Sequence, residues 1–189
     1  MALAKGAVAL AIQETWFLPG EDAAFGSLLP NHGIFYDNGK NGYAGCMTIF
    51  GPKVVAEYTL TKMATPAGME GRALLVCGAH RKGGENMMVL NVHFPNDSAD
   101  QAKFIKTLVA WRELKEGGRA YLLGDFNFVL EAEDSSTGKA PNVTGRVRLA
   151  WSKLVSLLGL MEVDQPTHTH FVLGKDLLTG SSRRLDRIY

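Results

Sequence analysis

Polar side chains follow several apolar runs of the sequence, at the points where predicted strands end. Glu14 follows "ALAIQ", Asn96 follows "NVHFP", and Asp125 and Asn127 follow "YLLG". Asp186 lies in the alternating run "RRLDRIY". Loops presented by a rigid sheet scaffold are where binding and catalytic residues concentrate. We therefore expect these side chains to converge at one mouth of the fold.

The chemistry of such a set would be that of hard oxygen donors. Asp and Glu side chains that are distant in sequence and close in space would bind a divalent cation, and Mg²⁺ prefers one or two carboxylates together with waters and phosphate oxygens. Such an ion serves phosphoryl chemistry by stabilising charge on the phosphorus oxygens and by orienting water. The sequence has no Cys and His spacing typical of structural zinc.

Each of these residues also has a purely structural explanation. Asp125 and Asn127 in "GDFN" are residue types that favour turns through local hydrogen bonds. Glu14 is equally explained by capping or pairing, His93 by a satisfied position in the core, and Asp186 by pairing with a neighbouring arginine. The residues taken singly therefore leave both explanations open.

The elements that must position these residues are mostly strands. The strand patterns are "AVALAIQETW", "GIFYD", "GCMTIF", "VVAEYTL", "RALLVCGAH", "NMMVLNVHF", "RAYLLGDFNFV", "THTHFVL" and "RRLDRIY". Helical periodicity occurs twice, in 98–116, where Ser98 and Gln101 predict a capping box and Gly117 a stop, and in 147–158, which should end near Gly159. The turn cluster "RKGGE" predicts an antiparallel hairpin. Seven to nine strands with two helices favour an α/β sandwich of two sheets over a doubly wound parallel sheet.

The composition is that of a single globular domain. The chain has 189 residues, of which 46% are hydrophobic and 21% are charged. No stretch approaches the roughly 20 apolar residues that cross a bilayer, so no membrane association is expected. Cys46 and Cys77 lie in apolar stretches and are expected to be reduced thiols.

The net charge of +1 gives the whole chain no general attraction to nucleic acid. Two local clusters of basic residues could still contact phosphates, although solvated surface charge is the more frequent explanation of each. The clusters are Arg146/Arg148/Lys153 and Arg183/Arg184/Arg187.

Taken in order, several stretches together resemble the endonuclease/exonuclease/phosphatase family. They are "IQETW", "GYAG", "NVHFPND", "LLGDFN", "THTHF" and "SRRLDRIY", and they extend over nearly the whole chain, from Ile12 to Tyr189. The chain is most similar to the apurinic-site-type endonuclease domains of non-LTR retrotransposons. The resemblance implies a DNase-like four-layer sandwich that hydrolyses phosphodiesters of DNA with Mg²⁺ or Mn²⁺.

The resemblance also implies roles for individual residues. Glu14 matches the principal metal-binding carboxylate, and Asp125 and Asn127 match the pair that orients the attacking water and contacts the scissile phosphate. His93 falls where relatives carry Tyr or His against the phosphate, and Asp186 matches an Asp that supports a catalytic His.

Two further residues are expected to bind substrate. Asn96 follows His93 in the same loop, and Arg184 precedes the Asp of the "LDR" motif.

Members of the family open with a strand that carries an Asn near its end, and they close with an "SDH"-like motif after "LDRI". This sequence contains neither, so the resemblance predicts one domain over residues 1–189 that is incomplete at both termini and lacks the first and last strands. Three functions stay open: a DNA endonuclease of a retrotransposon-like element, a phosphatase or lipid phosphodiesterase of the same fold, and a catalytically inert remnant or binding module. A retrotransposon origin predicts an intracellular protein with access to the nucleus.

Overall fold

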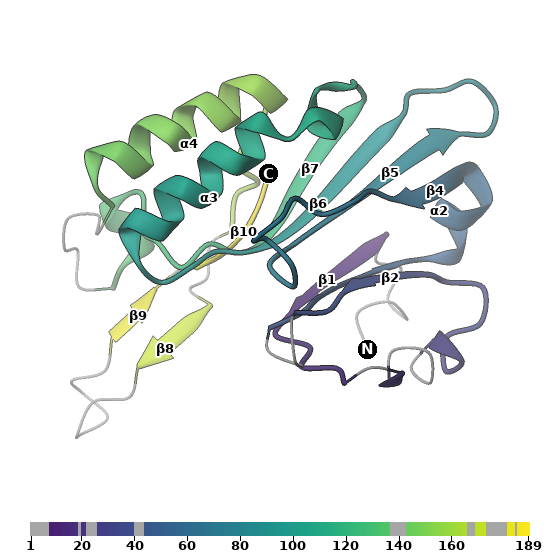
Figure 1. The fold of residues 1–189 in the computed structure, drawn as a ribbon, viewed down its shortest axis with the longest axis horizontal. Helices are drawn as coiled ribbons and strands as arrows, with labels where there is room; N and C mark the ends of the chain where they lie inside the picture. The colour runs from purple at the N-terminus through teal and green to yellow at the C-terminus, as the bar shows by residue number, and fades with distance from the viewer. Residues whose placement is uncertain are drawn as a thin grey trace.

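The structure is a computed structural model that describes residues 8–18, 20–21, 26–39, 44–136, 143–165, 169–172, 181–183 and 185–189. Two sheets face each other, and a pair of helices packs on the larger sheet (Figure 1). The smaller sheet has the strand order β1-β3-β2, with β1 Ala9–Gln13, β2 Gly33–Asp37 and β3 Cys46–Phe50. The larger sheet has the order β10-β7-β6-β5-β4, with β4 Tyr58–Lys62, β5 Ala73–His80, β6 Met87–His93, β7 Arg119–Asp125 and β10 Asp186–Ile188.

Strands β5 and β6 form the centre of the molecule because both of their faces are buried. Leu74 and Val89 pack between the two sheets, whereas Leu75 and Leu90 pack under the helices. The continuous apolar runs in the sequence are the expected signature of strands covered on both sides. The two strands pair antiparallel, as the "RKGGE" turn predicts, while β6 and β7 pair in parallel.

Two helices, α3 Ser98–Ala110 and α4 Gly145–Leu158, cover the outer face of the larger sheet (Figure 1). Helix α4 ends at Gly159, whose φ of 62° gives the left-handed C-cap that the sequence predicts. The capping box predicted at Ser98 is wrong: the Asp97 side chain caps α3 by accepting hydrogen bonds from the backbone N–H groups of Ala99 and Asp100.

The other end of α3 also differs from the prediction. The helix ends at Ala110, and the 3-10 helix Arg112–Lys115 fills the distance to the two predicted glycines. Leu114 of this short helix is buried with Trp111 in the same core, so packing of the apolar residues sets where the α-helix stops.

Three strand predictions need correction. The run "VVAEYTL" is split, because α2 Pro52–Glu57 is helical and only β4 is extended; a proline at the first turn favours the helix there. The run "RRLDRIY" is also split, with β9 Ser181–Arg183 pairing only β8 His170–Val172 and β10 pairing β7. The described residues therefore contain ten strands and not seven to nine.

The prediction of an α/β fold with two sheets flanked by helices is confirmed. Both cysteines are free thiols, and burial raises the pKa of Cys46 to about 12. In the part of the chain that the structure describes, no helix is both long and apolar enough to cross a membrane.

Candidate active site

His93 and Asp125 end two neighbouring strands, and their positions are coupled by the register of the sheet. They are opposite residues in the parallel pair of β6 and β7, so both strands end at the same edge. Asp186 begins β10 on the far side of β7 and is opposite Asp125 in that antiparallel pair. The sheet itself therefore brings together three residues that lie 32 or more positions apart in the sequence.

Gly124 makes this register possible. Its φ is 140°, and a Cβ atom placed on it would lie 1.9 Å from the carbonyl oxygen of Val92 in β6. Only glycine permits both the backbone conformation and this close approach. The glycine of "LLGDFN" thus fixes the strand end that presents Asp125.

Glu14 reaches the same edge from the smaller sheet, in the loop that follows β1. Its φ is 54°, an uncommon conformation for a residue with a side chain. Two backbone hydrogen bonds hold the loop: Thr15 N–H donates to the Gly45 carbonyl at 3.3 Å, and Trp16 N–H donates to the Ala44 carbonyl at 3.2 Å. The last two residues of "GYAG" therefore position the carboxylate of "QET".

The side chains converge on the imidazole of His93. Its Nε2 lies 3.7 Å from Glu14 Oε1 and 4.0 Å from Asp125 Oδ2. The His93 side chain is 9% exposed, whereas those of Asp125 and Glu14 are 27% and 58% exposed. Two carboxylates beside Nε2 favour the tautomer that carries its proton there. Exposure to solvent therefore increases across the site, from the buried imidazole of His93 through Asp125 to the exposed carboxylate of Glu14.

Burial shifts the titration of the two inner groups. Burial lowers the pKa of His93 and the Arg72 guanidinium acts in the same direction, against the opposing effects of the Asp125, Glu14 and Asp186 carboxylates. Burial also raises the pKa of Asp125, and the negative charges of Asp186 and Glu14 raise it further. At neutral pH the imidazole is therefore neutral and Asp125 is a more basic carboxylate than usual.

Asn127 orders the turn after β7. Its φ is 50°, its backbone N–H donates to Asp125 Oδ1 at 2.9 Å, and its Nδ2 donates to the Phe94 carbonyl at 2.8 Å. Gln101 of α3 donates in turn to the Asn127 carbonyl at 3.1 Å. An amide nitrogen carries two hydrogens, so one Asn127 N–H is left beyond the bond to Phe94.

Aromatic side chains of the core pack against this turn. Phe126 and Phe128 alternate with Asp125 and Asn127, and the two rings are buried in the core whereas the two polar residues are half-buried. Phe126 stacks on Phe94 with 5.1 Å between ring centroids. The cluster holds the polar residues on a rigid base, as preorganised sites require.

The structure describes only one of the two residues that were expected to bind substrate. Asn96 is exposed in the loop between β6 and α3, and no hydrogen bond or ion pair among the described residues links it to the site. Arg184 lies outside the described residues.

Arg187 has a structural role that the sequence patterns did not indicate. It is 1% exposed, forms an ion pair with buried Asp134 and donates to Glu162 at 3.0 Å. Its placement in a phosphate-contacting cluster is therefore wrong, and so is the pairing of Asp186 with this arginine. The guanidinium is buried because two carboxylates neutralise it.

Two residues near the site were missed. Asn91 is fully buried in β6 and joins the two sheets, since its Nδ2 donates to the carbonyls of Ile12 and Met47 and its Oδ1 accepts from Gln13. A polar residue inside the apolar run "MMVLNVHF" was the available signal. Arg72 precedes β5, and its Nη1 donates to the His93 carbonyl at 3.4 Å.

The donor set suits a hard cation, although its ligands are few. Among the residues with described positions, no three His, Cys, Asp or Glu side chains are grouped as a metal cluster. Mg²⁺ needs only one or two carboxylates when waters and phosphate oxygens complete its shell. The Glu14 carboxylate is exposed and lies 3.7 Å from His93 Nε2, so it is available as one such ligand.

Comparisons with known proteins agree with the fold. No family model matches the chain. The transposon TX1 uncharacterized 149 kDa protein of Xenopus laevis is 25% identical over 181 residues, which are 94% of this chain and 13% of that protein. The chain thus spans about an eighth of the curated relative that it matches.

Solved structures match over a larger share of their length. The endonuclease domain of TRAS1, a telomere-specific non-LTR retrotransposon, has a TM-score of 0.67 at 13% identity, covering 99% of this chain and 74% of that one. The AP endonuclease LMAP of Leishmania major has a TM-score of 0.72 at 15% identity, covering 98% and 70%. An AP endonuclease of Archaeoglobus fulgidus has a TM-score of 0.61 at 19% identity, covering 98% and 77%. The resemblance to the endonuclease/exonuclease/phosphatase family is thus confirmed for the fold.

Proposed function

We propose that this chain, which has the fold of retrotransposon endonuclease domains and AP endonucleases, hydrolyses phosphodiester bonds of DNA with Mg²⁺ or Mn²⁺. The observation that carries the proposal is the convergence of Glu14, His93 and Asp125, with His93 Nε2 within 4.0 Å of both carboxylates. Its context is that of an endonuclease of a mobile element, since the curated relative is a transposon protein.

In the proposed reaction, the carboxylate of Asp125 accepts a proton from a water molecule while the water oxygen attacks phosphorus. The pKa of Asp125, raised by burial, makes it a better base for this transfer. The bond from phosphorus to the leaving oxygen breaks in line with the attack, and that oxygen takes a proton from solvent. The hydroxyl and phosphate ends of a nicked strand result.

The neutral imidazole of His93 donates its Nε2 hydrogen to a phosphate oxygen, and the second N–H of Asn127 is a further donor. Both donors are fixed before substrate arrives, because His93 is set by the sheet register and Asn127 by the Phe94 carbonyl. Glu14 would hold the cation. When bound, that ion would neutralise charge on the phosphate oxygens.

The direct test is nicking of supercoiled plasmid DNA by the purified chain with Mg²⁺, with Mn²⁺ and with EDTA, at several salt concentrations. We expect nicking that depends on the divalent ion and is lost in Asp125→Asn and reduced in Glu14→Gln. Glu57→Gln is the matched control, since that exposed carboxylate ends α2, a helix that contributes no residue to the site.

The alternatives are outcomes of the same experiment. Hydrolysis of phosphorylated inositols or sphingomyelin without nicking would assign a phosphatase or lipid phosphodiesterase. Absence of all hydrolysis, together with a melting temperature that Mg²⁺ leaves unchanged, would assign a non-catalytic module.

A further inference from the structure

Four cations line the groove between α3 and α4 from both sides. Lys103 and Lys106 belong to α3, and Arg146 and Lys153 belong to α4. All four are exposed, and no ion pair joins any of them to another described residue. Lys103 and Lys106 are three positions apart and Arg146 and Lys153 are seven positions apart, so the two residues of each helix lie on the same face of that helix.

Other exposed arginines of this chain do have carboxylate partners. Arg148, on α4, pairs with Glu131 at 3.3 Å, and Arg119 pairs with Glu85 at 3.0 Å. The sequence cluster of Arg146, Arg148 and Lys153 is therefore divided by the fold. Arg148 is engaged with a neighbouring loop, whereas the other two join the lysines of α3.

The groove is continuous, because its hollows share lining residues. A hollow of about 730 Å³ has Lys103, Lys106 and Arg146 in its wall, and the adjoining one of about 320 Å³ has Lys106, Arg146 and Lys153. Among the residues that the structure describes, no Asp or Glu lines either of them. The positive potential in the groove is thus not offset locally.

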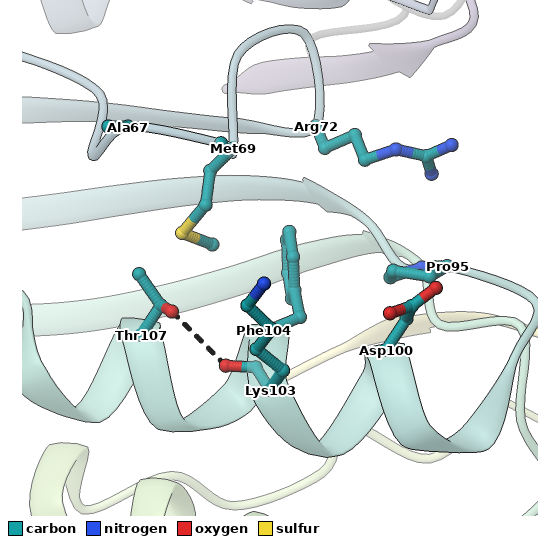
Figure 2. A pocket seen from close by; sticks show the side chains of 9 residues that line it. Ala67, Met69, Arg72, Pro95, Asp100, Lys103, Phe104 and Thr107 are labelled. Atoms are coloured by element: carbon teal, nitrogen blue, oxygen red, sulfur yellow. Dashed lines mark hydrogen bonds between the residues drawn. The ribbon is translucent and has the colours of Figure 1, made fainter.

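The groove begins beside the loop that follows His93, since Ser98 and Ala99, at the start of α3, line its larger hollow. Lys103 also lines the cavity shown in Figure 2, where it lies across from Arg72, with Asp100 in the same wall of α3. Arg72 donates to the carbonyl of His93, so it marks the border of the site. Helix α3 has 13 residues and is therefore about 20 Å long, the length of about six phosphates along one strand of a duplex.

We propose that the α3–α4 groove binds the phosphate backbone of the nucleic acid that continues beyond the cleavage position. This inference rests on the proposed function, since the groove begins beside the loop that follows His93. Unpaired lysine and arginine side chains that follow a strand bind phosphates without reading bases, and each contact releases bound counterions. The groove therefore adds affinity and salt dependence and leaves sequence preference unchanged.

The test is fluorescence anisotropy of a labelled 30-base-pair duplex in EDTA over a series of KCl concentrations. The variant is Lys106→Glu with Arg146→Glu, and the matched control is Lys53→Glu with Lys82→Glu. Lys53 lies in α2 and Lys82 in the turn between β5 and β6, and both are exposed. Each pair changes the net charge from +1 by four units to −3, so the two variants have the same net charge and differ in where it is reversed.

We expect the groove variant to bind at least about tenfold more weakly at low salt, and its plot of log affinity against log salt to be shallower by about two. The control pair should keep the wild-type slope. An unchanged slope in the groove variant, or equal losses in both pairs, would overturn the inference. If the groove variant fails to fold by thermal unfolding, Lys106→Gln with Arg146→Gln is judged by the same slope.

The outcomes separate this inference from the proposed function. Groove-dependent binding by a wild type that cleaves nothing would defeat the hydrolase proposal alone. Cleavage with groove-independent binding would defeat the groove alone. Asp125→Asn should bind with the wild-type slope, because the groove acts without catalysis.

Discussion

His93 and Asp125 are opposite each other in the parallel pair of β6 and β7, with 4.0 Å between Nε2 and Oδ2. Both side chains are partly buried, and this burial lowers the pKa of the imidazole and raises the pKa of the carboxyl group. The two groups therefore tend toward a neutral donor and a basic acceptor side by side, which is the pairing that attack on a phosphodiester needs.

Replacement of His93 tests its role as a donor. We expect His93→Ala to lower kcat/KM for nicking of a fluorogenic duplex by about 10²-fold or more, as removal of a positioned proton donor commonly does. His93→Gln keeps an N–H and should retain more activity than His93→Ala. Equal activity in the wild type and both variants would show that the imidazole takes no part in the reaction.

The pH dependence of stability provides a second test of the His93 environment. Its pKa lies below 6.5 in the folded protein, so the unfolded chain binds more protons between the folded value and 6.5. The free energy of unfolding should therefore rise with pH through that window, and the loss of stability should appear as pH falls below 6.5. The pKa of Asp125 is raised in the folded protein, so the folded state binds more protons just above pH 3.8. In that acidic window the free energy of unfolding should therefore fall as pH rises.

His93→Gln removes the part of this pH dependence that comes from the lowered pKa of His93. The difference in melting temperature between about pH 7.5 and about pH 5.5 should be smaller in this variant than in the wild type. If both proteins gain the same stability over this interval, burial of His93 is not its source.

Gly124 can be tested by a matched pair of alanine substitutions. Gly124→Ala places a Cβ atom 1.9 Å from the Val92 carbonyl oxygen, whereas Gly117→Ala has a comparable positive φ of 91° and nothing within 4 Å. We expect Gly117→Ala to cost about 1–2 kcal/mol in urea unfolding, from backbone conformation alone. Gly124→Ala should cost clearly more and also reduce nicking, because it disturbs the register that sets His93 against Asp125. Similar costs for both variants would contradict a steric role.

Asn91 is predicted to hold the two sheets together. Asn91→Ala leaves the Ile12 and Met47 carbonyls and the Gln13 amide without their partner, which should cost about 1–3 kcal/mol for each group that stays buried and unsatisfied. Thr61→Ala, at an exposed position of β4, should change stability by less than about 0.5 kcal/mol. Urea unfolding of both variants measures the difference, and equal midpoints would argue against the network.

Sequence alone determined the features that depend on neighbouring residues. The end of α4 at Gly159, the hairpin of β5 and β6, and the polar residues at the ends of strands all follow from local patterns of a few residues. These patterns, taken in order, also predicted the fold class. The two wrong local predictions also have local causes. Asp97 caps α3 in place of Ser98, and Pro52 starts a helix where "VVAEYTL" predicted a strand.

Tertiary structure decided which of these residues meet. The approach of Glu14 to His93, the burial of Arg187 between Asp134 and Glu162, and the alignment of Arg146 with Lys106 join segments between 25 and 79 positions apart. Strand register and helix packing set these contacts, and both depend on burying apolar surface over the whole domain. No pattern within a short stretch contains that information, so the sequence could nominate the members of the site but not their arrangement.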